Sequence, residues 1–185
     1  PIRSSHSLNT QSCLSFEQGV CAAGHPVAAE AGAWAIQQGG TAIDALVAAA
    51  FTAFVVEPAS CGLGGYGHFS VYLAAENRHI GFDAYCRAPL DATPDIFQLD
   101  MSRPTTYYGH PHTVGNKAEH GPMSPAVPGE VAGCCDLLET YGTLSLETVL
   151  VPAIAAAEKG IPFLWNTLLH IASLGDTLSD LPDTD

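Results

Sequence analysis

Residues 19–58 read GVCAAGHPVAAEAGAWAIQQGGTAIDALVAAAFTAFVVEP, and this stretch decides the fold. It holds a short apolar run, two helical patterns and a double glycine between them. Residues 20–23 form a strand candidate. Pro26 suits the first position of a helix, because proline needs no amide hydrogen there and its φ is preset. The pattern predicts a first helix over 27–38 that stops at Gly39-Gly40, where a left-handed residue costs little.

The second helical pattern covers residues 42–56 and is almost wholly apolar, with Asp44 and Thr52 as its only clear polar residues. Thr41 is a good N-cap, and Asp44 stands three residues later in the manner of a capping box. A helix that is apolar all round is buried. At about 15 residues it spans about 22 Å, too short to cross a bilayer comfortably. We therefore predict the central core helix of a sizeable soluble protein.

A glycine loop at 62–65 and a β-hairpin follow. The predicted strands are 67–73 and 79–84, joined by a short polar turn. The loop lacks the lysine of a phosphate-binding loop, so its glycines are better explained by unusual φ or close backbone approach. On the first strand, His68 is interpreted as a structural histidine in preference to a catalytic base.

The rest of the chain is less regular. Residues 87–125 are dense in Pro, Gly, His and Tyr. We predict an ordered but irregular segment that is anchored by Tyr107 and Tyr108. Long irregular segments inside a domain are often functional. Residues 1–17 are expected to be an extended lead-in, and 175–185 an acidic tail. Further helices are predicted at 94–99, at 128–139, from the Ser145 cap to Lys159 and at 162–170.

The composition narrows the function. Among 185 residues 47 % are hydrophobic, which suits a piece that another chain partly covers. The formal net charge is −13 and the six Lys and Arg residues are scattered, which argues against binding to nucleic acid or an anionic membrane. We interpret the acidity as a solubility feature in preference to an acidic binding surface.

The six cysteines have no CxxC pairing, and we expect no disulfide scaffold in a chain of this size. Cys21, Cys134 and Cys135 stand in apolar contexts and are predicted to be buried free thiols. His110 and His112 are close in sequence, but no further ligand joins them, so we predict neither a metal site nor a cofactor. The compartment stays open between periplasmic or secreted and cytoplasmic.

Specific motifs recur in order along the chain. They are HP–A–AG–I–GG–A–DA–VA from His25, then VEP and a glycine loop, then Asp83 with Ala88-Pro89, then AVPGEVAG at 126–133 and YGTLSLETVLVPAIAAAEKGIPF at 141–163. In these blocks the chain resembles the N-terminal part of the large subunit of γ-glutamyltranspeptidase-like enzymes. The resemblance implies the four-layer αββα sandwich of N-terminal-nucleophile (Ntn) hydrolases, with residues 18–185 completed by other chains.

By themselves, the residues contain no catalytic constellation: GxSxG, HExxH and GxxxxGK motifs are all lacking. The resemblance explains this. In the family a zymogen cleaves itself, and the new N-terminal Thr of the small subunit becomes the nucleophile, with its own amine as base. It implies no catalytic residue in this chain, a heterodimer with a small subunit, and a small-molecule amide as substrate.

One departure from the family bears on the substrate. Typical members bind the γ-glutamyl carboxylate through an Arg in a D-x-R-E-x-A-P motif. Residues 83–89 here read DAYCRAP, so Tyr85 and Cys86 stand at the Arg and Glu positions. A phenol cannot match a carboxylate as a guanidinium does. Arg87 either takes over substrate binding or is a structural ion-pair partner, and the structural interpretation is slightly preferred.

Tyr85 and Arg87 are therefore the candidate substrate-binding residues of a hydrolytic branch, such as the cephalosporin acylases or small-amide hydrolases, in place of a true γ-glutamyltransferase. A second hypothesis is a non-catalytic relative that serves as a binding or scaffold protein, which the altered Tyr85 and Cys86 positions also suit. A third is an independent domain that binds an apolar ligand.

Overall fold

A computed structural model describes residues 19–106, 109–162 and 164–175. Within them the fold is mixed helix and sheet, with five α-helices and two two-stranded antiparallel sheets. The elements are α1 (Pro26–Gln37), α2 (Ala42–Val56), β1 (Gly67–Leu73), η1 (Ala74–Glu76), β2 (Arg78–Ala84), β3 (Leu99–Asp100), β4 (His112–Thr113), η2 (Val114–Asn116), α3 (Glu130–Tyr141), α4 (Leu146–Lys159) and α5 (Trp165–Ser173).

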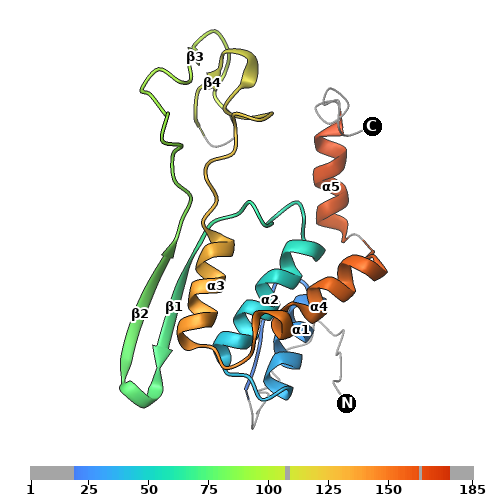
Figure 1. Cartoon of the computed structure of the whole chain (residues 1–185). Coiled ribbons are helices and arrows are strands. Elements are labelled where there is room, and N and C mark those ends of the chain that lie inside the picture. Colours follow the sequence, from blue (N-terminus) through green and yellow to red (C-terminus); the bar gives the residue numbers. More distant parts are fainter. Residues whose placement is uncertain (1–18, 107–108, 163, 176–185) are drawn as a thin grey trace, which may run out of the picture.

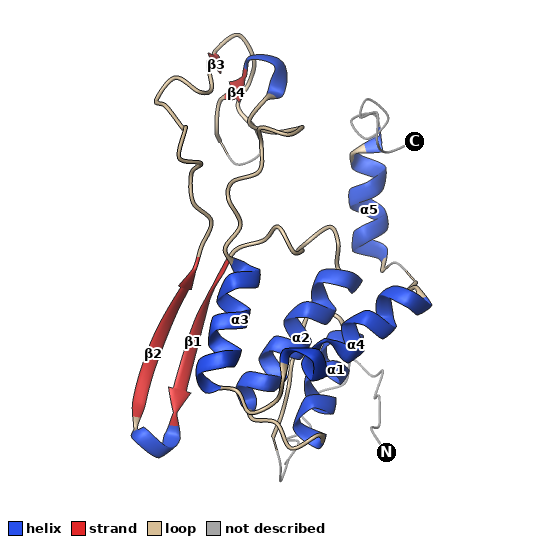
Figure 2. Cartoon of the chain, viewed as in Figure 1, coloured by secondary structure: helices blue, strands red, loops and turns tan. Residues whose placement is uncertain are grey.

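Apart from α5, which projects beyond α4, the elements form three parts that are seen in Figure 1. The first is a helical body in which α2 packs against α1, α3 and α4. The second is the β1–β2 hairpin, which lies on the other side of α3 (Figure 2). The third is a lobe, defined here as residues 88–126, which holds β3 and β4 and projects beyond the open end of the hairpin. Helix α3 thus connects the helical body to the hairpin.

The two helices of the deciding stretch are confirmed. Helix α1 begins one residue earlier than predicted, at Pro26, and the Val27 amide donates to Nδ1 of His25 (3.1 Å) as the N-cap contact. It ends before Gly39, whose φ of +88° is the left-handed conformation that glycine permits. Helix α2 has the predicted bounds and the predicted capping box. Among the described residues, no helix is both long and apolar enough to cross a membrane.

The strand predicted at residues 20–23 is wrong, because this segment pairs with no strand of the described chain. It packs along α1 instead. A Cβ on Gly19 would lie 3.1 Å from the Ile36 side chain, and one on Gly32 would overlap the Cys21 sulfur. Of the run 20–23 only Cys21 is half-buried against the helix, while Val20 is 69 % exposed.

Asp44 joins segments that are distant in sequence. It is fully buried, and its carboxylate accepts from the Thr41 amide (2.6 Å) and hydroxyl (2.7 Å) at the start of α2. It also accepts from the amides of Thr143 (2.9 Å) and Leu144 (2.8 Å) and from the Thr143 hydroxyl (3.0 Å), up to 100 residues away. Burial alone would raise the pKa of Asp44, but these hydrogen bonds outweigh it and lower the pKa. Asp44 thereby fixes the α3–α4 connection to the core.

The predicted hairpin is confirmed to within one residue. Strand β1 pairs antiparallel with β2, and η1 with Asn77, at φ +48°, makes the turn. Alternate residues face α3: Phe69, Val71 and Ile80 pack with Leu137 in one apolar cluster. A two-stranded sheet needs such a helix against one face to be stable.

The later helices are confirmed with shifted bounds. Helix α3 starts after Gly129, two residues later than predicted. Helix α4 has its predicted Ser145 cap and its predicted end at Lys159, before Gly160. Helix α5 starts at Trp165. The helix predicted at 94–99 is wrong. Only a turn forms there, because Leu99 and Asp100 pair with β4 and the Val114 amide bonds to the Gln98 carbonyl (2.9 Å). The predictions for residues 1–17, Tyr107, Tyr108 and 176–185 fall outside the described residues.

Candidate functional site

The stretch 83–89 lies at the open end of the hairpin, where β2 leaves toward the lobe (Figure 1). The glycine loop enters β1 at the same end, and the start of α3 reaches it too: the Glu130 amide donates to the Gly65 carbonyl (3.3 Å). Segments 61–68, 83–87 and 127–130 therefore meet in one place. We call this place the hairpin mouth.

Tyr85 contacts two other rings at the hairpin mouth. Its ring centroid lies 4.5 Å from that of Tyr66, with 58° between the planes, and 5.2 Å from the nearly parallel ring of His68. Tyr66 and Tyr85 are 53 % and 46 % exposed. The adjacent phenol of Tyr66 is the main cause of a raised pKa for Tyr85, with desolvation and Cys86 contributing. Tyr85 therefore presents a neutral phenol. The motif pointed to Tyr85. Tyr66 was not singled out, although pairing of residue 67 with residue 84 in the predicted hairpin sets it beside Tyr85.

Asp83 contacts two members of this cluster. Its Oδ1 accepts from the backbone amide of Tyr85 (3.0 Å) and lies 3.4 Å from Nδ1 of His68. An aspartate that bonds the amide two residues on fixes a local turn. The same carboxylate thus sets the backbone of Tyr85 and the position of the ring that stacks on it.

The start of α3 fixes the other side of Tyr85. A Cβ on Gly129 would lie only 2.6 Å from the carbonyl oxygens of both Ala84 and Tyr85. Real Cβ atoms do not approach carbonyl oxygens so closely, so this position requires glycine. The backbone of Tyr85 is therefore held between Asp83 and α3.

Glu130 lies under the glycine loop, a contact that the sequence did not reveal. A Cβ on Gly65 or Gly67 would meet its carboxylate oxygens at 2.5 Å and 3.3 Å. Of the predicted loop, 62–65, only Gly65 is explained by a close approach; Gly62 and Gly64 have neither a positive φ nor an atom within 4 Å of an added Cβ, so the prediction is wrong there. Burial raises the pKa of Glu130. A carboxyl group against the loop disfavours a phosphate there, because like charges repel.

Arg87 is exposed, and its backbone forms an isolated antiparallel bridge with Val127, with N–O distances of 3.0 Å and 2.9 Å. No carboxylate of the described residues lies within ion-pair distance of its guanidinium. The bridge closes the neck of the lobe. The predicted substrate contacts of Tyr85 and Arg87 stay predictions.

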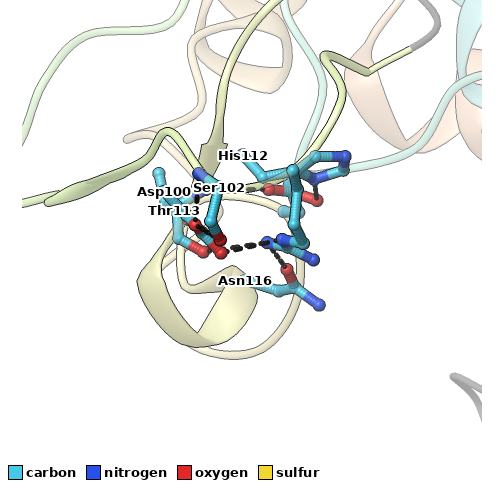
Figure 3. A network of polar contacts seen from close by, with 7 residues as sticks. Asp100, Ser102, His112, Thr113 and Asn116 are labelled. Carbon is cyan, nitrogen blue, oxygen red and sulfur yellow. Dashed lines mark hydrogen bonds and ion pairs between the residues drawn. The ribbon is translucent and has the colours of Figure 1, made fainter.

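The lobe carries its own polar network, shown in Figure 3. Arg103 donates to Oδ2 of Asp100 (2.8 Å), to Oδ1 of Asn116 (2.7 Å) and to the Thr113 carbonyl (3.3 Å). Beside it, Nδ1 of His112 and Oε2 of Glu119 are 2.8 Å apart. The contact with His112 is the main cause of a lowered pKa for Glu119. These side chains hydrogen-bond to one another, so they stabilise the fold of the lobe.

Within the described residues, thiols and metal ligands are not gathered into a site. The five described cysteines are free; Cys134 is buried, while Cys21 and Cys135 are partly so, and Cys13 lies outside the described residues. Burial raises the pKa of Cys134 to about 12, which keeps this thiol inert. In the described ranges no group of three His, Cys, Asp or Glu side chains is placed to hold a metal ion.

An apolar groove of about 320 Å³ lies between α2 and α4. Phe51, Phe54, Leu63, Leu150 and Ile154 are among its lining residues. Ligand sites usually combine apolar walls with a few polar groups that fix orientation. All the residues that line this groove are apolar, so it gives the hypothesis of an apolar-ligand domain little support.

Three comparisons with known proteins agree. The sequence profile of the family described as gamma-glutamyltranspeptidase matches residues 28–184. The chain is 37 % identical over 146 residues to the glutathione hydrolase proenzyme of Bacillus subtilis (strain 168), and 37 % identical over 162 residues to the acylase ACY 1 proenzyme of Pseudomonas sp. (strain V22). The structure of Helicobacter pylori gamma-glutamyltranspeptidase superposes with a TM-score of 0.81 at 30 % identity.

The extent of these matches is asymmetric. The two curated relatives are matched over 79 % and 84 % of this chain but over only 24 % and 28 % of their own length. The Helicobacter pylori structure is matched over 94 % of this chain and 47 % of that one. The chain thus spans about a quarter of the curated relatives.

Proposed function

The chain belongs to the γ-glutamyltranspeptidase family, and from that premise we propose that it is the N-terminal part of the large subunit of a self-processing amide hydrolase or acyltransferase. Its relatives are named hydrolase and acylase proenzymes, which agrees with activity that follows cleavage of a precursor. The nucleophile is then the N-terminal Thr of a separate small subunit, activated by its own amine. This chain contributes substrate contacts.

The proposal includes the four-layer αββα sandwich of Ntn hydrolases. The β1–β2 hairpin would join one of its sheets, and α2 would lie in a helical layer beside it. Exposed apolar surface supports completion by other chains: Trp165, Leu168 and Leu169 of α5 are 77 %, 53 % and 59 % exposed. Large exposed apolar patches mark protein interfaces. Residues 18–185 are therefore proposed to pack with the small subunit and the rest of the large one.

Hydrolysis is proposed in preference to γ-glutamyl transfer, and one observation carries this choice. Tyr85, at the motif position where the family's carboxylate-binding Arg is expected, is a neutral phenol held in an aromatic cluster. It cannot replace the charged, two-pronged contact of a guanidinium with the α-carboxylate. Tyr85 and the exposed Arg87 are the proposed substrate-binding residues.

The test is intact mass spectrometry of the full-length protein under denaturing conditions, followed by an activity screen. We expect two chains, the smaller beginning with Thr, and hydrolysis of glutaryl or oxamate amides in preference to γ-glutamyl transfer to an acceptor. An efficient γ-glutamyl transfer would refute the hydrolytic choice and leave the family mechanism intact.

A second candidate is a non-catalytic relative that acts as a binding or scaffold protein. Tyr85 and Cys86, which depart from the usual Arg and Glu of the motif, favour it. It predicts an unprocessed precursor with no amide hydrolysis. The mass measurement alone decides between the two candidates.

A further inference from the structure

The aromatic cluster at the hairpin mouth suggests which substrates the site accepts. We propose, building on the function proposed above, that Tyr66 and Tyr85 bind an uncharged aromatic ring at the far end of the substrate's acyl group. The site would then hydrolyse arylacetyl-type amides better than amides whose acyl group ends in a carboxylate. The proposal rests on ring geometry, on rigidity and on the charges around the rings.

The ring surface is available. Tyr66 and Tyr85 are 53 % and 46 % exposed although their rings pack at 4.5 Å. The 58° between the two planes leaves an angled apolar surface, and aromatic rings prefer such tilted or offset partners to a flat sandwich. His68 covers Tyr85 at 5.2 Å in a nearly parallel stack. A third ring can therefore add to a cluster that already exists.

The cluster is also held in place. Asp83 accepts from the Tyr85 amide at 3.0 Å, and Gly129 lies against the carbonyls of Ala84 and Tyr85. Tyr66 follows the loop that Glu130 supports through Gly65. A surface that is ordered before binding loses little entropy when a ligand arrives.

The surrounding charges select against an anion. Asp83 and Glu130 place two carboxyl groups at the hairpin mouth. The exposed Arg87 is the cation of the same segments, but neither it nor another Lys or Arg side chain of the described residues stacks on the rings. A carboxylate that loses its water must gain a charged partner or several hydrogen bonds. The Asp83 side chain is 68 % exposed, and water screens its charge, so an organic cation gains little from it. An uncharged ring has no charge to desolvate and is not repelled by the carboxyl groups.

The experiment compares three chromogenic substrates with the processed full-length enzyme: the phenylacetyl, butyryl and glutaryl p-nitroanilides. The leaving group is the same in all three, so ratios of kcat/KM report the acyl end alone. They are also independent of the fraction of enzyme that is folded. We expect phenylacetyl to exceed glutaryl by about tenfold or more, as burial of one ring provides, and butyryl to lie between them.

Variants assign the effect to the ring. Tyr85→Ala is expected to lower the phenylacetyl-to-glutaryl ratio by about tenfold, chiefly through KM, while Tyr85→Phe keeps the ratio. Tyr85→Leu retains apolar volume without the ring and separates the two contributions. Tyr72→Ala is the matched control. Tyr72 is 52 % exposed and packs on His79 at 4.6 Å, the same kind of pair at the turn end of the hairpin.

The results that would overturn the proposal differ from those that would refute the enzyme function. Preference for glutaryl, abolished by Arg87→Ala, would assign the acyl end to Arg87. A ratio unchanged by Tyr85→Ala and Tyr85→Leu would exclude the rings. In both cases amide hydrolysis stands. An uncleaved chain that hydrolyses none of the three substrates would refute the hydrolase function, and this inference with it.

Discussion

Two polar networks, one in the helical body and one in the lobe, are built from similar groups but differ in burial. The Asp44 carboxylate accepts five hydrogen bonds and is fully buried. Arg103 donates to three acceptors, but its side chain and that of Asp100 are 37 % and 24 % exposed. A hydrogen bond lost in the core leaves an unpaired group, whereas water replaces one lost at the surface. Burial, more than the number of bonds, should decide what each network contributes.

The largest expected effect comes from Asp44→Ala. It removes the buried acceptor of the Thr41, Thr143 and Leu144 amides, which reach Asp44 from residues at the edge of the core. We expect the free energy of unfolding to fall by about 3 kcal/mol or more, measured by urea denaturation of the purified protein. Asp100→Ala, a substitution of the same type in the lobe, serves as the control and should cost well under half as much.

Acid should remove part of the same stabilisation. The folded-state pKa of Asp44 lies below its ordinary value of 3.8, so its contribution is present above pH 3.8 and is lost as pH falls through the folded pKa. The stability difference between wild type and Asp44→Asn should therefore shrink below pH 3.8. Denaturation curves between pH 2 and pH 6 give this difference, and a constant gap would contradict the assignment.

A smaller effect is expected where the hairpin meets α3. Alanine at Gly133 would favour the helix by about 1 kcal/mol, but its Cβ would overlap that of Ala84 and lie 3.2 Å from the Phe69 ring. Overpacking costs about 1–3 kcal/mol, so the net change should be a loss of stability. Gly64→Ala, where no atom lies within 4 Å, should be neutral. The melting temperatures of the two variants provide the measurement.

The smallest effect is expected in the lobe. Arg103→Ala should lower global stability by less than about 1 kcal/mol, because exposed ion pairs contribute little. It should nevertheless open the lobe locally, since Arg103 connects Asp100 with Asn116. Faster hydrogen exchange at the Val114 and Ala118 amides, with unchanged exchange in α2, would show this. Equal acceleration in both places would mean that the two networks are one cooperative unit.

The sequence could predict contacts between neighbouring residues but not contacts between distant segments. Thr41 with Asp44, Ser145 and Gly39 are local signals, and they predicted helix ends that the structure has. The further bonds from Asp44 to Thr143 and Leu144 span up to 100 residues, and no local pattern contains them. Residues 20–23 and 94–99 were wrongly predicted for this reason: tertiary partners decided their conformation.

The candidate site divides in the same way. The motif at 83–89 drew attention to Tyr85 and Arg87 without any structure. Glu130 joins the hairpin mouth because α3 packs on β2 and brings residue 130 beneath the glycine loop. Tyr66 joins it because Gly67 pairs with Ala84, which sets residue 66 beside residue 85. The glycines at 65 and 67 were visible, but the group that requires their small size was not.

The bridge between Arg87 and Val127 also bears on how this fold could be re-engineered or diversified. The two ends of the lobe are hydrogen-bonded to each other at 2.9–3.0 Å, so whatever they enclose starts and finishes at one point. The entropy of closing a loop grows only slowly with its length, and insertions are tolerated best where their ends already touch. The neck is thus a natural graft junction: residues 88–126 can be shortened, lengthened or exchanged for another module while the hairpin, α3 and the aromatic cluster keep their places.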